Sequence, residues 1–276
     1  MQQLVRDMRI GSKIILGRYS CNKDADPQPI VWLKATLDNV FIAQDALDYI
    51  CFDARELREN PTTYNRYQNG GTSYTNSNIH TYLNSDADEW YVARHRLDMP
   101  PIRETTYGYG ATGDYSSHPG FLRHFEEYEI SSIITDTVMV SGETVDTKVR
   151  LPLSHEVVGD SRFMLFNRKG VRAHPSEDLV QEKGRWTAFD STSRYIPYVM
   201  ADRHERFPAC IYQMDAGCYL NSTYPEGSNG IRPVIKLDPC AKVDMIEKNT
   251  YELVPFGASQ IDVWSGDDFM SLLGLV

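Results

Sequence analysis

The sequence predicts an α+β domain built from twisted antiparallel sheets, with two or more short helices and long loops. Two observations carry this prediction. Short runs of β-branched and aromatic residues alternate with Asp, Asn and Pro turns at 13–19, 30–36 and 40–43, a pattern typical of an antiparallel meander. Residues 186–237 repeat the alternation, which predicts hairpins in one sheet.

Helical spacing of apolar residues is confined to short segments. The apolar residues of 78–84 recur at helical intervals, and Asn76 or Ser77 is placed to cap the amino end. We expect further helix over 90–98, which ends before two prolines, and over 121–130. Three more short strands are expected, at residues 138–140, 149–153 and 251–254.

Composition indicates a globular protein and argues against nucleic acid and anionic membranes as partners. The 276 residues are 41% hydrophobic and 24% charged, and the formal net charge is −10. The basic residues are scattered among acids, so no basic footprint for nucleic acid or an anionic membrane is evident. The amino terminus lacks the apolar core of a secretion signal, and no window is long enough for a membrane-spanning helix. We therefore expect synthesis in a cytoplasm, and the alternative destination is a virion.

The chain is expected to divide into a domain over 1–238 and a C-terminal extension over 239–276. The apolar residues 269–276 suggest that the extension docks on the body or mediates homo-oligomerisation. The five cysteines are odd in number and include no Cys-x-x-Cys pair, so neither a disulfide framework nor a zinc site is indicated. We expect no metal and no cofactor.

Several segments occur in the order seen in one domain family. They are Leu-Gly-Arg-Tyr at 16–19, Val-Trp-Leu at 31–33, the Ser/Asn-rich stretch at 74–84, the Phe- and Glu-bearing segment at 120–130, the segment at 147–156 that ends in Ser-His-Glu, and the closing strand Asn-Gly-Ile-Arg-Pro-Val-Ile-Lys-Leu at 229–237. The chain thereby resembles an uncharacterised family of bacterial and phage domains with a C-type-lectin-like fold. Formylglycine-generating enzymes and the variable proteins of diversity-generating retroelements share that fold.

The resemblance spans residues 10–238 and implies a ligand-binding scaffold whose loops face one side. Two departures stand out. Residues 85–119 are longer than the family pattern, and its Trp-Trp-Leu-Arg-Ser motif is degraded at 185–190. The family has no established activity, so the resemblance implies a fold more than a function.

A Gly-x-Gly-x-x-Gly string at 108–113 is better explained as a surface loop than as a dinucleotide site. Pro119 and the serines that follow the string do not open the helix that such a site needs. Tyr107, Tyr109 and Tyr115 in this loop are candidate ligand contacts, because loop tyrosines give a large contact area at low entropic cost.

A second candidate face lies in the C-terminal hairpins. In relatives diversified by retroelements, exposed positions just before and within this hairpin form the binding face. The corresponding residues here are Tyr195, Tyr198, Tyr212, Tyr219, Asn221 and Tyr224. A strand surface that packs on its neighbours is an equally good explanation. Trp32 and Trp186 are expected in the core, and Arg232 is expected to point inward onto a carboxylate or backbone carbonyls.

These observations favour a non-enzymatic binding module. The resemblance adds the expectation of a virion-associated protein, such as a decoration, fibre-associated or receptor-binding protein, that recognises a host-surface glycan or protein. One alternative is an oxidase of the formylglycine-generating type with a reactive Cys210 or Cys218. Another is a purely structural protein that assembles through its carboxyl tail.

Overall fold

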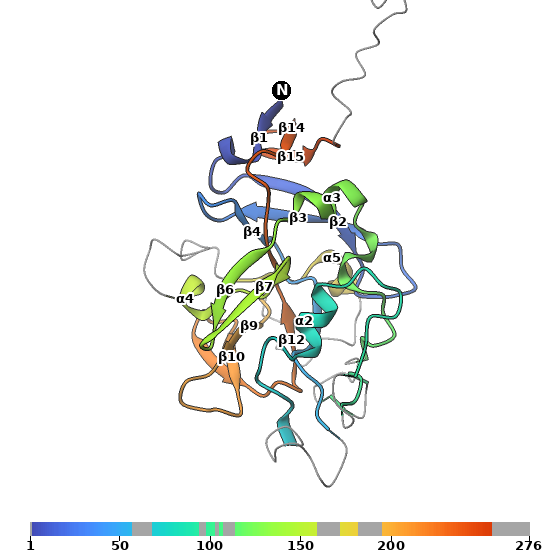
Figure 1. Ribbon diagram of the computed structural model, residues 1–276, viewed down its shortest axis with the longest axis vertical. Coiled ribbons are helices and arrows are strands. Elements are labelled where there is room, and N and C mark those ends of the chain that lie inside the picture. The colour runs from blue at the N-terminus through green and yellow to red at the C-terminus, as the bar shows by residue number, and fades with distance from the viewer. Residues whose placement is uncertain are drawn as a thin grey trace, which may run out of the picture.

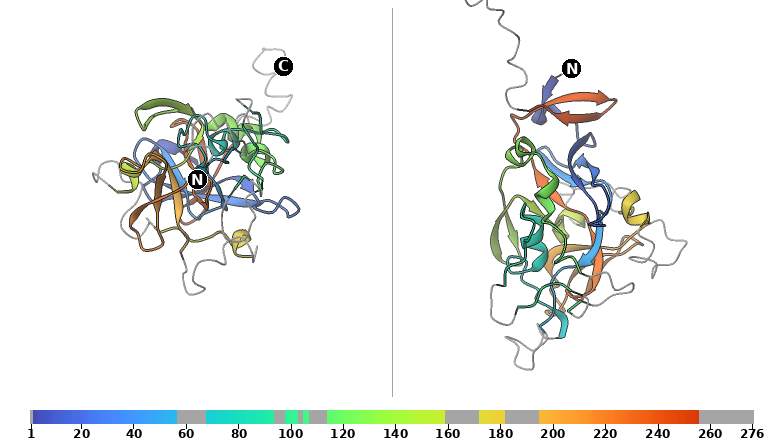
Figure 2. Two further views of the ribbon diagram at one scale, coloured as in Figure 1. Left: turned by 90° about the horizontal axis from the view of Figure 1, so that it is seen from below. Right: turned by 90° about the vertical axis from the view of Figure 1, so that its right-hand side faces the viewer.

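The computed structural model describes residues 2–56, 68–93, 98–102, 105–106, 114–158, 172–181 and 195–255. Within these ranges the chain is an α+β fold dominated by strands, as the sequence predicts (Figure 1). Figure 2 shows the same ribbon from two further directions. No helix in the described part of the chain is long and apolar enough to cross a membrane.

The larger sheet has eight strands. In spatial order they are β1 (Gln2–Leu4), β14 (Lys242–Glu247), β15 (Thr250–Leu253), β2 (Lys13–Tyr19), β3 (Gln28–Lys34), β4 (Val40–Ala43), β13 (Val234–Lys236) and β8 (Val149–Arg150). The meander β2–β3–β4 is antiparallel throughout, which confirms the prediction for the amino-terminal runs. The expected strand at 251–254 is confirmed as β15, which lies parallel to β2.

The smaller sheet has five strands, in the order β11 (Leu220–Thr223), β10 (Ile211–Met214), β9 (Tyr198–Arg203), β12 (Ser228–Ile231) and β5 (Asp48–Cys51). A separate hairpin consists of β6 (Asp136–Val140) and β7 (Glu143–Thr147). In Figure 1, β9 and β10 lie at the lower left, and β1, β14 and β15 lie at the top.

The helices are short. They are η1 (Val5–Asp7), α2 (Asn78–Leu83), η2 (Phe121–His124), α3 (Glu127–Ser132), α4 (Ser154–Val157) and α5 (Glu177–Gln181). The predicted helix near residue 80 is confirmed as α2, and the Ser77 hydroxyl caps it by accepting a hydrogen bond from the backbone N–H of His80 at 3.2 Å.

Two helix predictions are corrected. Residues 90–93 have no helical conformation, because Trp90 is drawn into the core, where its ring stacks on Tyr115 with centroids 5.3 Å apart. The segment over 121–130 is divided into η2 and α3. The break falls at Phe125 and Glu126, whose extended backbone lets Glu126 begin α3 as its N-cap.

The closing segment 229–237 is not one strand in one sheet, as predicted, but two strands in two sheets. It pairs with residues 40–51, which are likewise divided: β4 pairs with β13 in the larger sheet, and β5 pairs with β12 in the smaller one. Arg232 and Pro233 lie at the crossover. Proline has no backbone N–H to donate to a ladder, and its carbonyl accepts a hydrogen bond from Ala43 at 2.9 Å.

Two expected core residues are found where the sequence places them. Trp32 is completely buried, and its indole N–H donates to the carbonyl of Leu16 at 2.8 Å. Arg232 is also buried, and its guanidinium donates to the carbonyls of Ala43 at 2.8 Å and Gln44 at 3.0 Å. Of the two partner types predicted for Arg232, these contacts use backbone carbonyls. Trp186 lies outside the described residues.

Residues 242–253 continue the larger sheet. The hairpin β14–β15 is inserted between β1 and β2, and Val243, Tyr251 and Leu253 contribute to the hydrophobic core. The first part of the expected extension is therefore integral to this sheet. Residues 256–276, with the apolar tail, lie outside the described residues.

Candidate functional site

The candidate site is the hairpin of β10 and β11 with its flanking residues 204–210 and 224, which we call the edge hairpin. Strand β11 forms the edge of the smaller sheet, and β10 is its only strand neighbour among the described residues. The two strands pair in register from Ile211 opposite Thr223 to Met214 opposite Leu220. In the turn between them, the carboxylate of Asp215 accepts a hydrogen bond from the backbone N–H of Tyr219 at 2.9 Å.

Three aromatic side chains of the edge hairpin are exposed to solvent. Tyr219 is 73% exposed, Phe207 55% and Tyr224 51%. Tyr219 follows the turn at one end of β11, whereas Tyr224 follows the other end and Phe207 lies in the loop before β10. Large apolar groups left in water at the edge of a sheet are a common feature of interaction surfaces.

The loop before β10 is ordered by His204. Its imidazole Nδ1 accepts hydrogen bonds from the backbone N–H groups of Arg206 at 3.1 Å and Phe207 at 3.2 Å. The same ring lies against two aromatic neighbours, with centroids 4.9 Å from Phe207 and 4.5 Å from Tyr212. Phe207 is therefore held in a defined position although half of it is exposed.

A buried amide side chain forms hydrogen bonds with the edge hairpin. Asn229 of β12 has almost no exposed surface. Its carboxamide oxygen accepts a hydrogen bond from Gln213 of β10, and its nitrogen donates to the hydroxyl of Thr223 at 3.4 Å and to the carbonyl of Gly227 at 3.1 Å. One side chain thus ties both strands of the edge hairpin to the centre of the sheet.

Among the described residues, the predicted ligand contacts fall into three groups. Tyr219, Asn221 and Tyr224 are exposed, and Tyr195 and Tyr212 are half-buried. Tyr115 and Tyr198 are fully buried, so for these two the prediction of a surface contact is wrong. Tyr107 and Tyr109 lie outside the described residues.

Core packing explains the two corrections. The Tyr115 ring stacks on Trp90, and its hydroxyl donates to the carbonyl of Cys51 at 3.1 Å. The Tyr198 ring lies beside the buried guanidinium of Arg232, 5.7 Å from its centroid. Both tyrosines have raised pKa values, chiefly because of burial, and that of Tyr198 is about 12.

Sequence reasoning missed His204 and Phe207. The available signal was an aromatic residue, Phe207, inside an otherwise polar run, Arg-His-Glu-Arg-Phe-Pro, just before the apolar run at 209–212. Such a residue has no core to join unless the turn folds back, which made its exposure predictable.

The cysteines bear on the enzymatic alternative. All five are free thiols. Cys210 is buried, and burial, followed by the nearby carboxyl of Glu226, raises its pKa, which disfavours a reactive thiolate. Cys218 is half-buried, and its Sγ accepts a hydrogen bond from the guanidinium of Arg172 at 3.2 Å.

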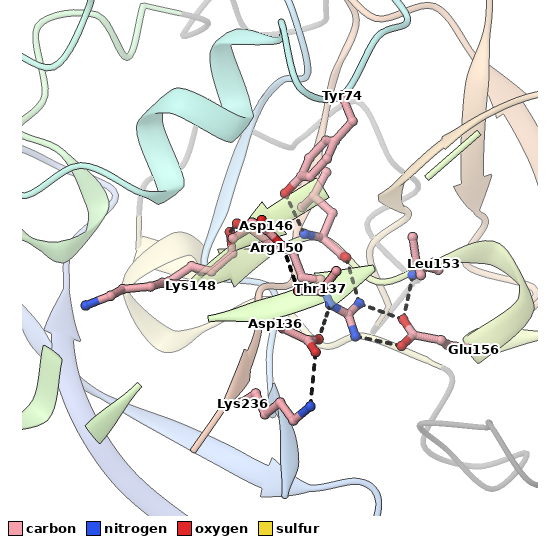
Figure 3. Close-up of polar contacts among 12 residues, drawn as sticks. Tyr74, Asp136, Thr137, Asp146, Lys148, Arg150, Leu153, Glu156 and Lys236 are labelled. Atoms are coloured by element: carbon pink, nitrogen blue, oxygen red, sulfur yellow. Dashed lines mark hydrogen bonds and ion pairs between the residues drawn. The ribbon is translucent and has the colours of Figure 1, made fainter. Parts of the chain in front are cut away.

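The segment 147–156 of the family resemblance forms a buried ionic network (Figure 3). Arg150 of β8 makes a two-pronged ion pair with Glu156, with nitrogen–oxygen distances of 2.7 and 2.6 Å, and a third contact with Asp136 at 3.1 Å. Burial opposes the charge of Arg150, but the two carboxylates outweigh it and raise the pKa of the guanidinium. Lys236 reaches the second oxygen of Asp136 at 3.3 Å.

This network is structural in character. Glu156 also accepts a hydrogen bond from the backbone N–H of Leu153 at 2.8 Å, so it closes the amino end of α4 as well as pairing Arg150. Both carboxylate oxygens of Glu156 are thereby used. In the described part of the chain, no group of three or more His, Cys, Asp or Glu side chains is arranged to hold a metal ion.

No family model matches this chain, and comparison with curated proteins and with solved structures gave no match.

Proposed function

We propose that the protein is a ligand-binding module and that the edge hairpin is its binding face. The observation that carries the proposal is the set of three exposed aromatic side chains, Phe207, Tyr219 and Tyr224, on an edge hairpin that Asn229 and His204 hold in place. Aromatic anchors on a preorganised frame lose little conformational entropy on binding.

The chemistry of β11 suits a neutral or weakly polar partner, and the exposed Glu205 and Arg206 in the loop before β10 carry opposite charges. Strand β11 reads Leu-Asn-Ser-Thr and carries hydroxyl and amide groups but no charge. Flat aromatic faces beside amides and hydroxyls can stack on a sugar ring and bond its hydroxyls, or cover a protein loop. We propose a host-surface glycan or protein as the partner, and the family resemblance supports a virion-associated protein with a C-type-lectin-like fold.

The test is binding of the purified protein to a glycan array and to intact candidate host cells. Replacement of Phe207, Tyr219 and Tyr224 together by Ala should weaken binding by at least about tenfold, because aromatic anchors commonly contribute 2 kcal/mol or more at an interface. Melting temperature should change little, because the replaced side chains are exposed.

A matched control replaces three exposed apolar residues outside the smaller sheet, namely Ile10, Leu37 and Ile246. This control variant should bind as the wild type does. Equal loss in both variants, or undiminished binding by the aromatic variant, would remove the edge hairpin as the binding face.

The enzymatic alternative now depends on Cys218. Its Sγ accepts a hydrogen bond from the guanidinium of Arg172, whereas Cys210 is buried and its pKa is raised by that burial. Alkylation of Cys218 much faster than that of the exposed Cys240 would favour the oxidase over the binding module.

A further inference from the structure

Glu226 is a buried carboxyl group next to the proposed binding face. It lies in the turn between β11 and β12, two residues after the exposed Tyr224. The residue is 6% exposed, and its Oε2 atom is buried and has no hydrogen-bond partner among the described residues. A buried carboxylate oxygen without a partner is costly when the group is ionised, and much less so when it is protonated.

The backbone of the same turn joins two other segments. The carbonyl of Pro225 accepts hydrogen bonds from Phe52 at 2.9 Å and Asp53 at 3.1 Å, at the end of β5. The backbone N–H of Glu226 donates to the carbonyl of Asn69 at 3.0 Å. These bonds fasten the turn to β5 and to the segment 69–71, and we call this meeting point the turn junction.

The turn junction is closely packed. Gly70 has a φ of +76°, and a side chain there would meet the carbonyl oxygen of Asp53 at 2.6 Å. Gly71 donates to the carboxylate of Asp53 at 2.8 Å, and that carboxylate also accepts from Asn78. Asp53 is thus satisfied by backbone donors, whereas Glu226 in the same junction has an unused oxygen.

The charged and titratable groups around Glu226 come from two elements. The end of β5 and the residues after it contribute Cys51, Asp53 and Arg55, and the loop before β10 contributes Cys210. Segment 69–71 adds no titratable side chain. Burial raises the pKa of Glu226 to about 7, although the backbone N–H of Glu226 itself and the nearby Arg55 both favour the ionised carboxylate.

We propose that Glu226 is a pH-dependent lock on the edge hairpin, closed when its carboxyl is protonated and loosened when it is ionised. Opening of the turn junction lets water hydrate the ionised carboxylate. Because Tyr224 lies in the same turn, the opening also releases this residue of the binding face. The proposal concerns regulation of the proposed binding face and rests on that function for its role, but the opening can be measured without any ligand.

The turn junction should open more readily as the pH rises, because the pKa of Glu226 is raised in the folded protein. The folded pKa lies above the ordinary value of 4.5, so the stabilising effect of the neutral form is complete below that value and is lost as the pH rises through about 7. Between pH 5 and pH 8, the opening equilibrium of the turn junction should increase on the order of 50-fold.

Hydrogen exchange of the full-length protein, corrected for the intrinsic pH dependence of exchange, measures this opening. Protection of peptides covering residues 220–231 should fall on the order of 50-fold from pH 5 to pH 8. Protection of the β3–β4 meander should stay constant. In Glu226→Gln the fall should disappear, whereas Glu247→Gln, at an exposed carboxyl on β14, should behave as the wild type.

The carboxyl ¹³C shift of Glu226 in the wild type gives its titration midpoint without any variant. A midpoint near that of an ordinary glutamate, or a fall in protection that persists in Glu226→Gln, would overturn the lock. Failure of the proposed binding function would be distinguishable from failure of the lock. In that case the turn junction would still open as the pH rises, but no glycan or cell surface would bind the protein at either pH.

Discussion

Arg150 and Arg232 are both buried, yet the fold satisfies their charges differently. Arg232 donates to the backbone carbonyls of Ala43 and Gln44 at the crossover between the sheets. Arg150 faces two carboxylates, Glu156 and Asp136. Burial lowers the pKa of Arg232 even though Tyr198 and Asp45 oppose this effect, because its carbonyl partners are neutral. The paired carboxylates instead raise the pKa of Arg150.

Removing one carboxylate of the Arg150 network should therefore destabilise the protein strongly. Glu156→Gln is expected to lower the free energy of unfolding by about 3 kcal/mol, because it leaves a buried guanidinium with half its countercharge. Urea denaturation measures the change. The matched control is Asp88→Asn, which removes the partner of Arg123 from an exposed ion pair and should cost less than about 1 kcal/mol. Similar values for the two variants would contradict a structural role for the network.

At the scale of elements, the contact between β2 and the helical segment η2–α3 depends on a glycine. Gly17 of β2 has a φ of +68°, and a side chain there would collide with the ring of Phe125. Its backbone N–H donates to the carboxylate of Glu129 in α3 at 2.9 Å. Only glycine combines this backbone conformation with such a close approach.

Gly17→Ala should consequently destabilise the protein more than a positive φ alone would. Strain in the left-handed region costs about 1–2 kcal/mol, and overpacking against Phe125 adds about 1–3 kcal/mol. Gly142→Ala is the matched control, because its φ is +92° and nothing lies within 4 Å of the added carbon. Thermal unfolding of both variants separates the two costs, and equal melting temperatures would rule out the steric contribution.

At the scale of the whole molecule, the hairpin β14–β15 connects the first and second strands of the chain. It pairs with β1 on one side and with β2 on the other. Truncation after Asp238 should lower the melting temperature strongly, because it removes the buried side chains of Val243, Tyr251 and Leu253, each contributing about 1.5–3 kcal/mol.

Truncation after Pro255 is the control for this experiment and should leave the described fold intact. Equal thermal stability of the two truncated proteins would mean that the hairpin β14–β15 does not stabilise the sheet. The same pair of truncations, examined by size-exclusion chromatography, tests whether residues 256–276 mediate assembly.

Local features of this protein follow from its amino-acid sequence alone. Strand runs such as 13–19 and 40–43, the cap at Ser77 and the burial of Trp32 depend on side chains close in sequence or on strong hydrophobicity, and these predictions are confirmed. The inward position of Arg232 was also predictable, because an arginine beside a proline in an apolar strand has few alternatives.

Which tyrosines face water and which strands share a sheet depend on contacts between distant parts of the chain. Tyr115 and Tyr219 both follow polar, glycine-containing loops, but one stacks on Trp90, 25 residues away, and the other is exposed. The division of 229–237 between two sheets depends on its partner segment 40–51, far away in the chain. Burial is a property of distant contacts, so residue type and local pattern do not fix it. The unpartnered carboxyl oxygen of Glu226 becomes visible only once β5 and the turn after β11 meet.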